Sequence, residues 1–338
     1  MEKNTNKESF FKRRGKRVVI VGLFAVLVFI SLMTGALKSV TVRSLLAGDE
    51  IVWMVFWSSR VPRTMAVIFA ASGLSVAGLI MQAISRNKFM SPSTSGATDA
   101  AGLGVIIAFI ALQAQAGIIQ TLFAFFFALI STVLFTSVIN RLKIRETVYI
   151  PLIGMMYGGL ISALTTVIAY RFDVMQMMAS VQLGSFARIG NFSTVYIIIA
   201  PLILAALYSA KFSIIGMGED FSKNLGLHYN RTVFLGLVIV ALTSAASFTA
   251  VGPLPFIGLI IPNMTASFYG DNIKKSIIDI MFFGADFVLI CDIISRLVIF
   301  PFEMSVSLII SVIGGAIFMV YLIRGMRNAK TRPRRSSL

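Results

Sequence analysis

Few residues in this sequence could do chemistry, and they form no recognisable catalytic set. There is one cysteine, Cys291, and one histidine, His228, which excludes a disulfide framework and argues against a Cys/His metal cluster. The sequence has no G-x-x-x-x-G-K phosphate loop followed by Ser or Thr, and neither a Ser/His/Asp nor an HExxH arrangement. We therefore expect no catalytic residue, no resident metal or cofactor, and no ATPase site in this chain.

The largest internal loop predicted on the cytoplasmic side, KFSIIGMGEDFSKNLGLHYNR (211–231), has the pattern of a short surface helix. Gly218 can begin it, and Glu219 and Asp220 then fall in its first turn, where the helix dipole favours acids. Gly226 suits the left-handed position that ends a helix. The segment is either a simple connector or a docking element for a soluble partner.

Two acids, Asp286 and Asp292, fall within or near an apolar stretch, where acids are costly and often functional. One interpretation is a proton relay. The other is a structural role, because Asp292 lies four residues before Arg296, a favourable spacing for an ion pair within a helix. We interpret Glu303, which follows Pro301, as an acid at the start of the last helix.

The elements that must position these residues are long apolar runs. The chain has 338 residues, of which 57% are hydrophobic and 13% charged, a composition typical of a polytopic membrane protein. About 20 apolar residues cross a bilayer as a helix. Ten such spans are predicted: 18–37, 64–84, 96–115, 117–139, 149–170, 194–212, 232–250, 255–270, 277–297 and 305–324. We expect an all-α membrane protein with one helical bundle.

The distribution of Lys and Arg along the chain predicts which side of the bundle faces the cytoplasm. With both termini in the cytoplasm, 23 of the 30 Lys and Arg lie on the cytoplasmic side, as the positive-inside rule requires. We predict a basic cytoplasmic tail (1–17), a transmembrane domain (18–325) with its polar segment at 213–230, and a second basic tail (326–338). The seven Lys and Arg on the outer side, exceptions to this rule, include Arg60, Arg63 and Arg296.

Prolines interrupt the stretch VGPLPFIGLIIP (251–262), which contains Pro253, Pro255 and Pro262. A broken helix at membrane depth is tolerated where it is buried in protein or lines a cavity. This stretch is therefore a candidate for the centre of a transport path.

The chain resembles the FecCD/BtuC-type permease subunits of binding-protein-dependent ABC importers for ferric siderophores, haem and vitamin B12. Several stretches carry the resemblance, in the same order and over nearly the whole length: RVPRTMAV (60–67), GLSVAGLIMQAISRN (73–87), LGSF (183–186), GMGEDFSKNLGL (216–227), VGPLPFIGLIIPN (251–263), GADFVLICDIISR (284–296) and PFEMSVSLIISVIGGAIF (301–318). A set of motifs in order is far more specific than any one of them.

The resemblance implies a type II ABC importer permease of ten helices in a bacterial cell membrane. It implies a second permease subunit, identical or paralogous, two ABC ATPase subunits and an extracytoplasmic siderophore-binding protein or lipoprotein. The arginines Arg60, Arg63 and Arg296 would then dock the binding protein, and Asp286 and Asp292 would be structural. Residues expected to couple to the ATPase are Gly218, Glu219, Asp220, Leu225 and Gly226. Candidates for the translocation path are Gly184, Ser185, Pro253, Pro255, Gly258 and Pro262.

The sequence departs from the family pattern at several positions. RNKFMSP (86–92) replaces the usual RNPLA-x-P and resembles a subgroup linked to catecholate-type ferric siderophores. Asn263 replaces a histidine, EMSVS (303–307) replaces ELPVG, and residues 179–182 lack the expected tryptophan. We therefore expect an importer permease for a ferric siderophore of the catecholate type.

Other functions remain open from the sequence. A related importer could move haem or a corrinoid. A proton-coupled secondary transporter would instead need a functional intramembrane acid and an inverted repeat, and Asp286→Asn would abolish its transport. A membrane enzyme is disfavoured because no polar cluster lies at one depth.

Overall fold

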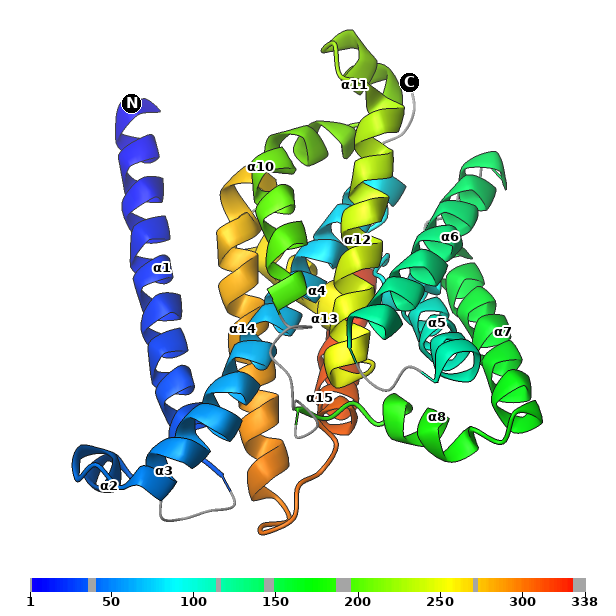
Figure 1. Ribbon diagram of the computed structural model, residues 1–338. Coiled ribbons are helices and arrows are strands. Elements are labelled where there is room, and N and C mark those ends of the chain that lie inside the picture. The colour runs from blue at the N-terminus through cyan, green and yellow to red at the C-terminus, as the bar shows by residue number, and fades with distance from the viewer. Residues whose placement is uncertain are drawn as a thin grey trace.

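A computed structural model describes residues 2–35, 41–113, 117–142, 149–186, 196–269 and 273–330. The chain is all-α, as predicted, and each of the ten predicted spans corresponds to one long helix (Figure 1). These helices are α1 (Glu2–Met33), α4 (Val61–Ser85), α5 (Ala97–Leu112), α6 (Ile118–Leu142), α7 (Tyr149–Arg171), α10 (Ile199–Ile215), α12 (Tyr229–Val251), α13 (Ile257–Tyr269), α14 (Ile273–Leu297) and α15 (Val306–Lys330).

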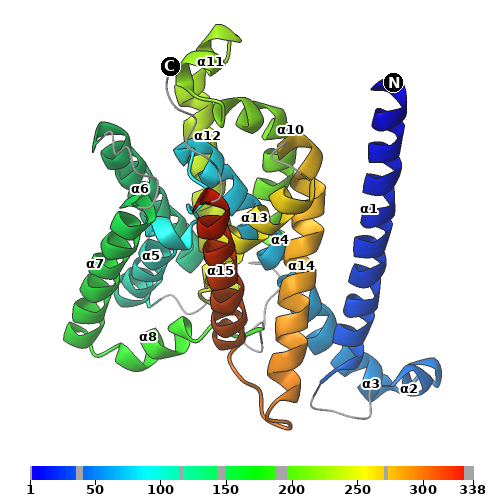
Figure 2. The ribbon, with the colours of Figure 1, turned by 180° about the vertical axis from the view of Figure 1, so that it is seen from behind.

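Short helices lie between the long ones. Within the described residues they are α2 (Val42–Leu46), α3 (Glu50–Val55), the π-helical turn η1 (Phe56–Arg60), the 3₁₀ turn η2 (Ser93–Ser95), α8 (Met175–Gln182) and α11 (Glu219–Asn224). Helices α2, α3 and α8 lie at one end of the bundle, and α11 lies at the other (Figures 1 and 2). Helix α1 begins at the α11 end (Figure 1).

Length and composition make four helical segments long and apolar enough to cross a membrane: Glu50–Ser85, Ile118–Arg141, Tyr149–Arg171 and Tyr229–Val251. Shorter apolar helices occupy Arg17–Met33, Ala97–Leu112, Ile199–Ile215, Ile257–Phe268 and Val306–Val320. The described part of the chain is thus a multi-pass bundle of apolar helices.

Helix boundaries differ from the predictions at both ends. Helix α1 begins at Glu2, so most of the predicted tail 1–17 is helical. Helix α15 continues to Lys330, beyond the predicted end at 324, and residues 331–338 lie outside the described residues. Charged residues such as Lys, Arg and Glu are good helix formers, so loss of hydrophobicity does not end a helix.

Helix α4 occupies the centre and packs against α10, α12, α13 and α14 (Figure 1). Small side chains on its surface, among them the fully buried Ala66, Ala70 and Ala77, allow this close packing. Helices α5, α6 and α7 form a second group that reaches the centre through α12 (Figure 2).

Helix α1 stands at one side, against α14. Phe24 and Phe282 pack edge to face with centroids 5.0 Å apart, and Arg17 Nε bonds to Asp279 Oδ1 at 2.8 Å.

Candidate functional site

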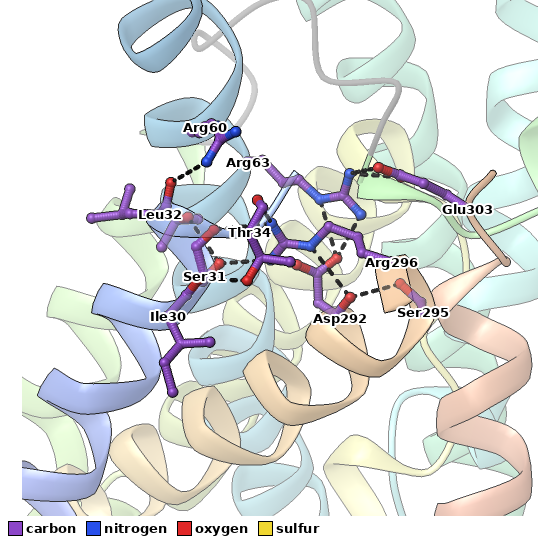
Figure 3. Close-up of polar contacts among 11 residues, drawn as sticks. Ile30, Ser31, Leu32, Thr34, Arg60, Arg63, Asp292, Ser295, Arg296 and Glu303 are labelled. Carbon is purple, nitrogen blue, oxygen red and sulfur yellow. Dashed lines mark hydrogen bonds and ion pairs between the residues drawn. The ribbon is translucent and has the colours of Figure 1, made fainter. Parts of the chain in front are cut away.

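The outer arginines predicted from the sequence come together where α1, α4 and α14 meet (Figure 3). Arg60 precedes α4, and its Nη1 donates to the carbonyl oxygens of Leu32 at 2.9 Å and Met33 at 2.6 Å. The last carbonyls of a helix have no partner within the helix, so Arg60 satisfies two of them at the end of α1.

Arg63 and Arg296 share one buried carboxylate, that of Asp292. Arg63 Nη2 lies 2.8 Å from Asp292 Oδ1, and Arg296 Nη2 lies 2.5 Å from Asp292 Oδ2. Arg63 Nη1 also donates to both carboxylate oxygens of Glu303, at 2.9 and 2.7 Å. Arg296 completes the set by donating to Ser31 O at 2.9 Å and Thr34 O at 2.7 Å. We call Arg60, Arg63, Asp292, Arg296 and Glu303 the arginine cluster.

The three arginines and Asp292 of this cluster are buried within the chain. Arg60, Arg63 and Arg296 are 5%, 9% and 4% exposed, and Asp292 is fully buried. A buried charge is tolerated only when it is paired and hydrogen-bonded. The predicted pair of Asp292 with Arg296 is confirmed. The interpretation of Glu303 as a helix N-terminal acid is wrong: α15 begins at Val306, and Glu303 pairs with Arg63.

The proline break predicted at 251–262 is a real break between two helices. Helix α12 ends at Val251 and α13 begins at Ile257, so Pro253 and Pro255 lie in non-helical backbone. The prediction that Pro262 interrupts the helix is wrong, because α13 runs through it. Proline cannot donate to the carbonyl four residues earlier, which is that of Gly258. Gln82 Nε2 of α4 donates to that carbonyl at 3.4 Å instead.

Gly184 and Ser185 meet the proline break, although some 70 residues of sequence separate them. The Ser185 amide donates to Val251 O at 2.8 Å. From the start of α15, Ser305 Oγ donates to Gly184 O at 2.8 Å, and Ser307 Oγ donates to Pro253 O. Both serines belong to the departure EMSVS, whose role the sequence did not reveal. We call Gly184, Ser185, Pro253, Ser305 and Ser307 the path junction.

Gly258, another predicted path residue, packs directly on α4. A Cβ atom at Gly258 would lie 2.9 Å from Leu74 O and 3.2 Å from the Gly78 Cα. Nearby, Asn263 Nδ2 donates to Lys88 O and Leu259 O, each at 2.7 Å. Asn263 therefore ties the departure RNKFMSP to α13, a role that no sequence pattern indicated.

The predicted coupling segment forms the short helix α11 at the end of the bundle where α1 begins (Figure 1). Gly218 precedes it with φ 117°, and Gly226 follows it with φ 76°, so both glycines adopt backbone that favours this residue. Glu219 Oε1 bonds to Lys223 Nζ at 2.8 Å, and this hydrogen bond raises the pKa of Lys223. The structure confirms the predicted helix, its first-turn acids and its glycine ends.

Helix α11 also exposes an apolar surface. Met217, Phe221 and Leu225 are 63%, 45% and 58% exposed. Ser222, in contrast, is buried, and its Oγ donates to Ile214 O of α10. A cavity of about 550 Å³ opens beside this segment, between α4, α10, α13 and α14, with Arg86, Met217 and Asn263 among its lining residues.

The two acids singled out in the sequence, Asp286 and Asp292, differ. Asp292 is fully paired, whereas Asp286 Oδ1 is buried and accepts no hydrogen bond from the described residues. A third acid, Asp99 of α5, lines a separate cavity. The sequence signal for Asp99 was present, because it is an acid within the apolar stretch 96–115. No group of three or more His, Cys, Asp and Glu that could hold a metal ion occurs among the described residues.

Known proteins are similar to this chain in sequence. The chain is 43% identical to the petrobactin import system permease protein YclN of Bacillus subtilis, over 79% of this chain and 85% of that protein. It is 36% identical to the ferric-anguibactin transport system permease protein FatD of Vibrio anguillarum, over 82% and 90% of the two chains.

Among solved structures, an ABC transporter of the metal-chelate type in an inward-facing conformation matches with a TM-score of 0.75. The match covers 91% of this chain and 98% of that chain at 21% identity, and it shows a shared fold. The model of the FecCD transport family matches residues 23–324, which hold the arginine cluster, the path junction and α11. The chain therefore belongs to the FecCD transport family.

Proposed function

We propose that this chain is the permease subunit of an ABC importer that carries a ferric siderophore, of the catecholate type, into the cytoplasm of a bacterium. The observation that carries the proposal is the 43% identity to a petrobactin import permease, supported by the 36% identity to a ferric-anguibactin permease. ATP would be hydrolysed by separate subunits docked at the α11 end, and a second permease subunit would complete the path.

The experiment that tests this function is uptake of radiolabelled iron by iron-starved cells with and without the gene. Catecholate, hydroxamate, citrate and haem forms of iron are compared. Cells without the gene are expected to lose uptake of the catecholate form. The intact gene should restore this uptake, and ATP depletion should abolish it. Unchanged uptake of every iron form, or uptake that follows the proton gradient alone, would contradict the proposal.

Coupling to the ATPase is proposed at the apolar surface of α11. Exposed apolar side chains on a rigid short helix suit a hydrophobic groove on a partner. Gly218, Glu219, Asp220 and Gly226 shape and cap the helix, and Leu225 supplies contact area.

Leu225→Asp is therefore expected to prevent co-purification of the ATPase subunits and to abolish uptake, because it places a charge in an apolar contact. The chain itself should fold normally, since Leu225 is exposed. The matched control is Asn230→Asp, which adds the same charge at an exposed position early in α12. Equal ATPase binding by Leu225→Asp and wild type would exclude this surface from coupling.

Docking of an extracytoplasmic binding protein is proposed at the opposite end of the bundle, where the arginine cluster lies. Arginine suits such contacts because its planar fork binds carboxylates with two hydrogen bonds. Arg63 and Arg296 already hold Asp292, so their part in docking is to fix the ends of α4 and α14. Arg60, on the turn before α4, is buried like the other two, but two of its hydrogen bonds go to neutral carbonyls, so its charge is the one that we propose a binding protein recognises.

Arg60→Glu is expected to abolish uptake while the ATPase subunits still assemble with the permease. The new carboxylate repels acidic groups on a binding protein and withdraws two hydrogen bonds from the end of α1. Arg60→Gln, which can still donate to α1, is the comparison that separates charge from packing. Wild-type uptake by Arg60→Glu would remove Arg60 from the docking surface.

A further inference from the structure

A cavity of about 240 Å³ lies between α5, α7 and α8, next to the end of α12. Its wall includes one acid, Asp99, and polar groups from three helices. The lining residues that matter here are Thr98, Asp99, Ser162, Thr165, Gln182 and Pro253. Because Pro253 belongs to the path junction, the cavity borders the proposed translocation path.

Asp99 is placed so that its carboxylate faces this cavity. It lies in the first turn of α5, where the helix dipole stabilises a negative charge. Among the described residues, its carboxylate forms no ion pair with a lysine or an arginine. Gly158 of α7 makes room for it, since a Cβ atom there would lie 2.5 Å from Asp99 Oδ2.

An acid in a membrane-spanning bundle is expensive, and such acids face cavities or partners and mark substrate pathways. The other acids within the predicted spans are Asp279 and Asp292, each paired with arginine, and Asp286, which has a buried oxygen. Asp99 differs from these three because it combines a missing cation among the described residues with an open cavity. A carboxylate in this setting recognises a positively charged hydrogen-bond donor.

Size restricts the ligand further. A volume of 240 Å³ holds about eight waters, at roughly 30 Å³ each, and is smaller than common pockets for whole ligands. It therefore suits one arm of a larger molecule. The hydroxyl of Ser162 and the amide of Gln182 offer further hydrogen-bonding groups around such an arm.

We propose that this cavity binds a protonated nitrogen group, such as an ammonium on one arm of the transported chelate, with Asp99 as the anionic partner. The inference rests on the proposed function and adds a chemical requirement on the cargo. Asp99 would then favour chelates that carry a cationic arm over neutral chelates of the same shape.

The test measures binding to the purified permease–ATPase complex in nanodiscs, without a binding protein. Two probes are compared: a ferric catecholate chelate with a primary amine on one arm, and the same chelate with that amine acetylated. Wild type is expected to bind the amine form about tenfold or more tightly, the range of a charge-assisted hydrogen bond. Asp99→Asn is expected to remove this preference and to leave binding of the acetylated form unchanged.

Two glycine variants keep the test valid if Asp99→Asn does not fold. Gly158→Ala displaces the carboxylate and should reduce the preference, whereas Gly159→Ala, with no atom within 4 Å of its new Cβ, should not. Equal affinity of wild type for both probes, or equal loss for both probes in Asp99→Asn, would overturn the inference. Iron uptake in cells, measured separately, shows whether the proposed function itself fails.

Discussion

Replacing Asp292 with alanine is expected to destabilise the protein so strongly that little folded protein is left in the membrane. The substitution leaves Arg296 without its carboxylate and deprives Arg63 of one of its two acidic partners. Removing one partner of a buried ion pair costs about 3–5 kcal/mol, because the other charge stays buried. Whole proteins are stable by only about 5–15 kcal/mol, so this loss is severe. Fluorescence-detected size exclusion and thermal inactivation in detergent measure it.

The control separates an orphaned charge from lost packing. Combining Asp292→Ala with Arg296→Met removes the cation as well, and part of the folded protein should return. Recovery stays partial because Arg296 also donates to Ser31 O and Thr34 O at the end of α1. Wild-type stability of Asp292→Ala alone would show that the arginine cluster does not hold these helices together.

The sequence predicted the ten helices because crossing a bilayer requires long apolar runs, a constraint that is local along the chain. Helix ends were less predictable. A charged segment such as 2–17 continues α1, since leaving the apolar region does not break backbone hydrogen bonds. The expectation that a proline ends a helix also failed at Pro262. The carbonyl of Gly258, which Pro262 leaves unpaired, accepts a hydrogen bond from Gln82 on another helix.

The candidate sites show the same limit. The pair of Asp292 with Arg296 follows from a spacing of four, whereas the pair of Arg63 with Glu303 joins residues 240 apart and no spacing predicts it. Resemblance to the family pointed to Gly184 and Pro253 separately. Their contact, and the serines that hold it, required the fold.

The second large effect is expected at the path junction, where Gly184→Ala should strongly reduce uptake of the ferric chelate. A Cβ atom at Gly184 would lie 2.6 Å from Pro253 O and would collide with Ser307 Oγ. Overpacking costs about 1–3 kcal/mol, and here the strain falls on the contact between α8, the proline break and α15. We therefore expect the folded protein to survive with its ATPase subunits bound, while uptake of the ferric chelate falls at least tenfold.

Two further variants show whether the collision is the cause. Gly315→Ala on α15 adds the same methyl group with no atom within 4 Å and should transport normally. Adding Ser307→Ala to Gly184→Ala removes the closest obstructing atom and should restore part of the uptake, whereas Pro253 O at 2.6 Å and the Cβ of residue 307 at 3.0 Å remain close. Normal transport by Gly184→Ala would mean that α8 and the proline break can separate freely. The path junction would then be a loose contact rather than a fixed part of the translocation path.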